Sequence, residues 1–169
     1  MERNEFISKL ESVKGIIYKV SNSYCPDIES RKDLAQEIVI QLWQSMDKYD
    51  PQYKFSTWVY RIALNMAISF YRKENTRNSR TTSIDETLID IAFELESKNE
   101  QESQLNLLNQ FIQQLDKLNK ALILLYLDGH NYDEIGNILG ISASNVGTKI
   151  NRIKKKLKRQ FETTTNHGT

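Results

Sequence analysis

One stretch decides the fold of this chain: Phe55-Ser-Thr-Trp-Val-Tyr-Arg-Ile-Ala-Leu-Asn-Met-Ala-Ile-Ser-Phe-Tyr-Arg72. At 100° per residue it reads as a helix that is apolar around most of its circumference. The remainder is a polar and aromatic stripe within an arc of about 80°, made of Trp58, Arg61, Asn65, Ser69 and Arg72. Because rings stack on unpaired bases and asparagine bonds base edges, the stripe indicates nucleic-acid binding. The alternative is that Trp58 belongs to the core and the arginines only face water.

Two further helices are predicted before this stretch. The first, about residues 5–20, has apolar side chains at spacings of three and four, and residues 23–28 read as a turn. A capping box at residues 30–33 begins the second, which Asp50-Pro51 should break. Its predicted apolar face consists of Leu34, Ile38, Val39, Leu42, Trp43 and Met46. Ser56 or Thr57 is the expected cap of the quoted helix, which should end between residues 72 and 75.

The second half of the chain contains a predicted helix-turn-helix. Helices are expected from Leu105 and over residues 118–128, and residues 131–134 form a capping box for a short helix that ends at Gly140. Ser142 caps the last helix, whose inward face is Val146, Ile150, Ile153 and Leu157. Such a unit presents the start of its second helix to the DNA major groove. The alternative is a helical hairpin whose lysines only solvate its end.

Charge is divided unevenly along the chain although its net value is only +1. Residues 1–80 carry 13 basic and 10 acidic side chains, and residues 117–169 carry 9 and 4. Between them, residues 81–116 are strongly acidic. We therefore predict an all-α protein of two small helical domains that could each bind a polyanion. The predicted boundaries are 1–80 for the first domain, 81–104 for an acidic linker, 105–162 for the second domain and 163–169 for a frayed tail.

The sequence gives little support to an enzyme, a metal site or a membrane protein. His130 and His167 are isolated, no glycine-rich phosphate loop is present, and Cys25 has no base near it in sequence. We expect no catalytic residue, metal or cofactor. The single cysteine, the charged start and the lack of an apolar run of about 20 residues favour a cytoplasmic protein.

Several of these motifs together resemble the extracytoplasmic-function (ECF) sigma factors. Asp33-Leu-Ala-Gln-Glu37, Leu42-Trp43, Asp50-Pro51 and the segment 55–65 resemble region 2 of that family. The segment 115–157, with Tyr132-Asp-Glu-Ile135 and Ile141-Ser142, is similar to region 4. The match covers nearly all of residues 1–161 in the family's order. It implies an initiation subunit that directs RNA polymerase to promoters and helps melt the minus-ten element.

The resemblance implies three sets of site residues. The first would meet the clamp helices of the polymerase β′ subunit, and consists of Asp33, Gln36, Glu37 and Gln41. The second would read and melt the minus-ten element, and consists of Trp58, Arg61, Asn65, Ser69, Arg72 and Lys73. The third would read the minus-thirty-five element, and consists of Ser144, Asn145, Thr148, Lys149, Arg152 and Lys155. The helix at residues 118–126 would lie near the β-flap contact.

One departure from the family is Gly147, where members often have an arginine. The glycine is expected to remove a DNA contact and to weaken the helix by about 1 kcal/mol relative to alanine. Minus-thirty-five reading could then be relaxed, and a separate DNA-targeting partner could recruit the protein. An anti-sigma factor is a further expected partner. The other functions considered are a stand-alone helix-turn-helix regulator, and a helical adaptor or anti-sigma protein.

Overall fold

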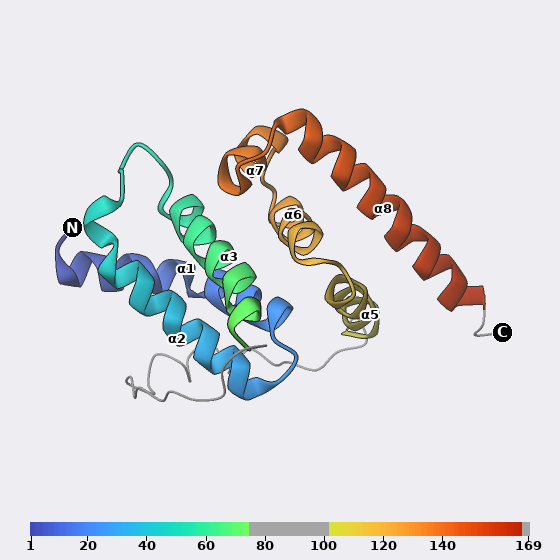
Figure 1. Cartoon of the computed structure of the whole chain (residues 1–169), viewed down its shortest axis with the longest axis horizontal. Helices are drawn as coiled ribbons and strands as arrows, with labels where there is room; N and C mark the ends of the chain where they lie inside the picture. The colour runs from blue at the N-terminus through green and yellow to red at the C-terminus, as the bar shows by residue number, and fades with distance from the viewer. Residues whose placement is uncertain (75–101, 167–169) are drawn as a thin grey trace. The chain divides into compact units, whose positions relative to one another are not determined.

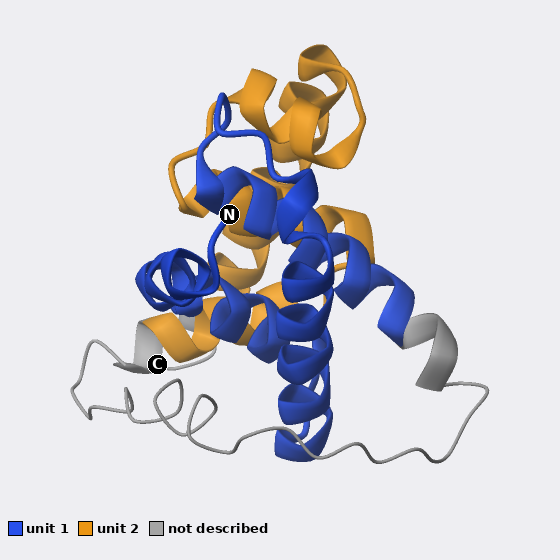
Figure 2. Ribbon diagram, turned by 90° about the vertical axis from the view of Figure 1, so that its left-hand side faces the viewer, with its two compact units in different colours: residues 1–97 blue, residues 98–169 orange. Residues whose placement is uncertain are grey.

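The structure is a computed structural model. It describes residues 1–74 and 102–166, with the backbone alone described for 71–74, 102–104 and 164–166. The described residues form helices and contain no strand, so the predicted all-α fold is confirmed. The chain divides into two compact units, residues 1–97 and 98–169 (Figure 2). This division falls within the predicted acidic linker, most of which lies outside the described residues, and the exact domain boundaries remain a prediction.

The described part of unit 1 contains three α-helices, each of which contacts the other two (Figure 1). They are α1 (Arg3–Tyr24), α2 (Ile28–Gln44) and α3 (Phe55–Glu74). The core that they share includes Phe6 and Val20 of α1, Leu34 and Ile38 of α2, and Leu64 of α3, all buried. Each such side chain stabilises the fold by about 1.5–3 kcal/mol relative to exposure. Of the predicted face of α2, Trp43 is 40% exposed.

Helix α2 begins earlier than the sequence suggested. Asp27 is its N-cap, and the carboxylate accepts a hydrogen bond from the Ser30 backbone N–H at 2.8 Å. This bond lowers the pKa of Asp27 below its usual value. The predicted capping box at residues 30–33 is therefore wrong. Ser30 lies inside the first turn, and Arg31 donates to the two carbonyls that precede the cap.

The connection between α2 and α3 also differs from the prediction. Helix α2 ends at Gln44, where the Ser45 hydroxyl donates back to the Gln41 carbonyl, and a 3-10 turn, η1 (Met46–Lys48), follows. The helix thus ends several residues before Asp50-Pro51. The carbonyl of Lys54 accepts from the backbone N–H groups of residues 57 and 58 at 3.0 and 3.3 Å. Because α3 already begins at Phe55, neither Ser56 nor Thr57 is its cap.

The described part of unit 2 contains four helices, of which α6 and α8 contact each other and both of the remaining two. They are α5 (Glu102–Gln113), α6 (Lys117–Leu127), α7 (Tyr132–Leu139) and α8 (Ala143–Asn166). Residues 120–125 of α6 are buried, as are the four predicted inward residues of α8. Helix α8 continues through residues 163–166, which were predicted to belong to a frayed tail. The Thr163 hydroxyl donates to the Arg159 carbonyl there at 2.8 Å.

The turn between α7 and α8 forms as the sequence predicted. Asn131 and Glu134 make the reciprocal bonds of a capping box, at 2.9 and 3.0 Å. Gly140 ends α7 with a φ of 72°, and the Ser142 hydroxyl accepts from the Asn145 N–H at 3.1 Å. A Cβ atom on Gly136 would lie 2.6 Å from the Ile141 carbonyl oxygen. The predicted helix-turn-helix is thus confirmed in its geometry.

Candidate nucleic-acid interface

The polar stripe of α3 lies at the surface of unit 1. Arg61, Asn65 and Ser69 are exposed, on the side of the helix opposite its buried residues. They occupy successive turns, so a bound chain could meet all three at once. The side chains of Arg72 and Lys73, which were predicted to continue the stripe, lie outside the described residues.

Trp58 at the start of the stripe is half-buried. Its ring centroid lies 5.4 Å from that of Tyr49 and 5.4 Å from that of Phe55. These three residues form what we call the aromatic cluster. Trp58 therefore combines the two interpretations open from sequence, because its ring contacts two other rings while the residue remains partly accessible. Sequence reasoning missed Tyr49 and Phe55, although both flank the Pro51 turn.

The aromatic cluster is bordered by a cation. The Lys9 ammonium of α1 lies 5.5 Å from the Tyr49 ring centroid and 5.9 Å from that of Phe55. The Tyr49 hydroxyl donates to the Tyr53 carbonyl at 2.8 Å, and the Tyr53 side chain is 62% exposed. Rings beside cations are the elements with which proteins hold single-stranded nucleic acid. Lys9 carried no signal in the sequence, because it approaches the cluster only in the folded unit.

The exposed face of α2 carries the residues predicted to meet polymerase. Asp33, Glu37 and Gln41 are exposed, and Gln36 is half-buried. Helical geometry places the half-buried Ile40 near the middle of this group. An apolar centre with a polar rim is the usual arrangement of a protein–protein contact. Sequence reasoning did not single out Ile40.

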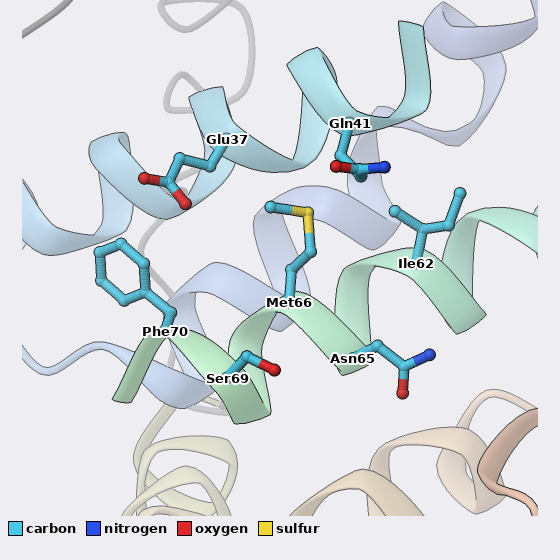
Figure 3. Close-up of a pocket in the computed structure, with 7 residues that line it drawn as sticks. All are labelled: Glu37, Gln41, Ile62, Asn65, Met66, Ser69 and Phe70. Carbon is cyan, nitrogen blue, oxygen red and sulfur yellow. The ribbon is translucent and has the colours of Figure 1, made fainter. Parts of the chain in front are cut away.

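A pocket between α2 and α3 joins two of the predicted sites. It has a volume of about 400 Å³ (Figure 3). Its lining residues are Glu37, Gln41, Ile62, Asn65, Met66, Ser69 and Phe70. Figure 3 shows Ile62 and Met66 of α3 on the side toward α2, with Asn65 and Ser69 beside them. The residues predicted for polymerase and those predicted for the minus-ten element thus share one groove, which their separation in sequence did not indicate.

In unit 2, α8 presents a second polar stripe. Ser144, Thr148, Arg152 and Lys155 are exposed and lie within about 80° of one another around the helix. Asn145 is exposed beside them, and Lys149 is half-buried on the flank. The structure therefore brings most of the predicted minus-thirty-five residues onto one face.

Lys154 differs from its lysine neighbours. Its ammonium donates to the Tyr126 hydroxyl at 2.5 Å and lies 4.1 Å from the centroid of that ring. This hydrogen bond raises the pKa of Lys154 above its usual value. Lys155 is exposed, and Lys158 lies 3.9 Å from Glu162. Lys154 therefore links α8 to α6, a role that the row of lysines in the sequence could not reveal.

Gly147 faces the first residue of α7. A Cβ atom there would lie 3.2 Å from Cε2 and 3.4 Å from Cδ2 of Tyr132. The glycine thus leaves room for the Tyr132 ring beside α8. A side chain at this position would extend toward that ring, so the glycine affects packing within unit 2 as well as any contact with DNA.

The described residues contain no group of three or more side chains that could hold a metal ion. His130 Nδ1 lies 3.5 Å from Glu134 Oε2, in the capping box of α7. Cys25 is buried. Among the described helices, none is long and apolar enough to cross a membrane.

Comparison with known families assigns each unit. The Sigma-70 region 2 family matches residues 10–77, which include α2 and α3. The Sigma-70, region 4 family matches residues 105–157, which include the helix-turn-helix. The two models together cover more than two thirds of the chain.

Whole-chain similarity agrees with this assignment. The chain is 27% identical to the ECF RNA polymerase sigma factor SigW of Bacillus subtilis, over 95% of this chain and 90% of that protein. It is also 27% identical to the sigma factor YlaC of the same organism, over 79% of each chain. The fold resembles Bartonella quintana RpoE in complex with the anti-sigma factor NepR, with a TM-score of 0.69 and 16% identity over 94% and 97% of the chains. It also resembles CnrH in complex with the cytosolic domain of CnrY, with a TM-score of 0.68 and 20% identity over 96% and 90%.

Regions 2 and 4 in this order define a transcription initiation factor of the sigma-70 type. The chain belongs to the extracytoplasmic-function sigma factors of that superfamily. Members of this family direct RNA polymerase and are not enzymes.

Proposed function

We propose that this sigma factor contacts core RNA polymerase through the exposed face of α2 and promoter DNA through the stripes of α3 and α8. One observation carries the proposal. Each unit presents an exposed stripe of hydrogen-bonding side chains on one helix, and each unit matches a sigma-70 family region. Because RNA polymerase and promoter DNA lie in the bacterial cytoplasm, we propose that the protein acts there.

The α2 face supports the polymerase contact. Asp33, Glu37 and Gln41 offer carboxylate and amide groups around Ile40, and no lysine or arginine lies within this face. Such a surface suits a partner that supplies basic donors around an apolar centre. We assign this partner to the β′ clamp helices. A β-flap contact by α6 would be limited to its edges, because residues 120–125 are buried while Leu127 is 53% exposed.

The α3 stripe and the aromatic cluster support promoter melting. Stacking of an unpaired base on an aromatic side chain contributes about 1–3 kcal/mol. The accessible part of Trp58 can provide such a surface, and the exposed Asn65 can bond the edge of an unstacked base. Arg61 and Lys9 can hold the adjoining phosphates. These groups act on single-stranded DNA and therefore favour the open state of the minus-ten element.

The α8 stripe supports duplex binding in the major groove. Asn145 and Arg152 have the hydrogen-bonding groups that read base edges, and Lys155 can neutralise a phosphate. The cap at Ser142 and the bond from Lys154 to Tyr126 fix where this helix begins and how it is held.

An anti-sigma factor is the proposed regulatory partner. The two similar structures are sigma factors in complex with NepR and with the cytosolic domain of CnrY. We extend that mode of control to this chain. A separate DNA-targeting partner is a second candidate, favoured by Gly147 in the reading helix.

The polymerase assignment is tested with purified protein and core RNA polymerase of the host. Glu37→Lys is expected to weaken core binding by about tenfold or more, because it reverses a charge within the α2 face and so places like charges opposite each other. Asp47→Lys, an equal change at an exposed residue of η1, is the control and should bind normally. Equal affinity of both variants, with unchanged helical circular dichroism, would contradict the assignment. A stand-alone regulator would instead bind its DNA with full affinity in the absence of polymerase.

A further inference from the structure

Thr148 lies in the middle of the exposed stripe of α8. Ser144 precedes it by one helical turn and Arg152 follows it by one turn, so all three share a side of the helix. Its side chain is exposed. If α8 enters the major groove as proposed above, Thr148 is among the residues nearest to the base edges.

The hydroxyl of Thr148 is already engaged within the helix. Oγ1 donates to the backbone carbonyl of Ser144 at 3.1 Å. This is the bond to the preceding turn that threonine commonly makes in helices. The hydroxyl proton is therefore not free to donate to a base acceptor such as guanine O6 or N7. The Cγ2 methyl occupies a different staggered position and is turned away from that carbonyl.

Only one base pair presents a methyl group in the major groove. Thymine carries it at C5, and apolar contact with this methyl is a known form of direct readout. A methyl–methyl contact needs no donor or acceptor, which suits a threonine whose hydroxyl is used internally. The flanking Ser144 and Arg152 retain polar groups for neighbouring positions.

We propose that Thr148 is a specificity-determining residue that selects thymine in the upstream promoter element through contact between its Cγ2 methyl and the thymine C5 methyl. The proposal rests on the proposed entry of α8 into the major groove. It adds a particular base and a particular chemical group to that role.

The test removes each methyl group in turn. Promoter fragments bound by the holoenzyme are first identified by sequencing, and each upstream thymine is then replaced by deoxyuridine, which lacks only the C5 methyl. Holoenzyme affinity is measured for wild type, Thr148→Ser, which keeps the hydroxyl, and Thr148→Val, which keeps the methyl. Thr163→Ser is the matched control, because its hydroxyl makes the same bond to Arg159 near the far end of α8.

Removal of one buried methyl should cost about fourfold in affinity. We expect wild type and Thr148→Val to lose this factor at one deoxyuridine position. Thr148→Ser should lose it on normal DNA and show no further loss with deoxyuridine, while Thr163→Ser behaves as wild type. A loss on normal DNA by Thr148→Val, with none by Thr148→Ser, would assign the contact to the hydroxyl and overturn the proposal.

A second outcome separates this proposal from the proposed function. If no deoxyuridine affects wild type while Arg152→Ala still weakens promoter binding, α8 reads DNA but Thr148 does not select thymine. If Arg152→Ala and Lys155→Ala also leave promoter binding unchanged, the major-groove role of α8 itself is wrong.

Discussion

Replacement of Gly136 by alanine should destabilise unit 2, although alanine is the better helix former. In an open helix this exchange stabilises by about 1 kcal/mol. At Gly136 the new Cβ would lie 2.6 Å from the backbone oxygen of Ile141, in the turn that leads into α8. A backbone oxygen cannot rotate away as a side chain can, so the turn must shift, and overpacking of this kind costs about 1–3 kcal/mol. The net expectation is a loss of up to about 2 kcal/mol.

Gly15 provides the matched control within the same chain. It lies inside α1, and a Cβ atom there would meet nothing within 4 Å. Gly15→Ala should therefore stabilise unit 1 by about 1 kcal/mol. The two substitutions are chemically identical, so the difference between them isolates the close approach of the turn at Gly136.

The assay can follow each unit separately. Both tryptophans, Trp43 and Trp58, belong to unit 1, so their fluorescence reports its unfolding in urea, whereas circular dichroism reports both units. Gly136→Ala should lower the urea midpoint for unfolding of unit 2, which circular dichroism detects and tryptophan fluorescence does not. It should also weaken duplex promoter binding by the holoenzyme. If Gly136→Ala stabilises unit 2 by as much as Gly15→Ala stabilises unit 1, the packing argument is refuted, because the turn then accepts the methyl group without cost.

Three further predictions concern charge, base contact and pH. Lys155→Gln should reduce the slope of log affinity for DNA against log salt concentration by about one phosphate contact. Lys154→Gln should leave this slope unchanged and lower the stability of unit 2, because the Lys154 ammonium is bound to Tyr126. Equal slopes for the two variants would contradict this division of roles. Asn65→Ala should retain duplex binding by the holoenzyme but lose open complex by about 1–3 kcal/mol, and a premelted bubble template should recover part of the loss; equal failure on both templates would contradict the melting role. The pKa of Asp27 is lowered by its bond to the Ser30 N–H, so its stabilising effect is present above pH 3.8, the unfolded value, and is lost as pH falls through the lower folded value. Asp27→Asn keeps the cap without titrating, so its free energy of unfolding should change less than that of wild type in this acid range.

Local signals in the sequence predicted the helix-turn-helix well. The capping box at residues 131–134, the turn at Gly140 and the cap at Ser142 depend on groups within a few residues of one another. Their geometry is therefore determined by residues that are close together in the sequence. The start of α2 was misassigned for a related reason, because Asp27 and Ser30 are both good caps and only the path of the chain after Pro26 selects between them.

Contacts between helices were harder to predict. The helical period correctly placed Arg61, Asn65 and Ser69 on an exposed stripe, since this needs only the geometry of one helix. It could not show that Lys9 approaches Tyr49, or that Lys154 turns back to Tyr126, because each pair joins different elements. The same limit explains why the sequence alone does not separate Lys154 from the other lysines of α8.

The groove between α2 and α3 connects the two roles proposed for unit 1. Glu37 and Gln41 from the α2 face line the same pocket as Asn65 and Ser69 from the α3 stripe (Figure 3). A partner that moves α2 relative to α3 would therefore alter the surroundings of the residues proposed to hold unpaired bases. Any such coupling must be reciprocal, so DNA that binds Asn65 would in turn change the affinity of the α2 face for polymerase. Polymerase binding and promoter opening in this sigma factor are thus expected to be energetically linked through one small pocket.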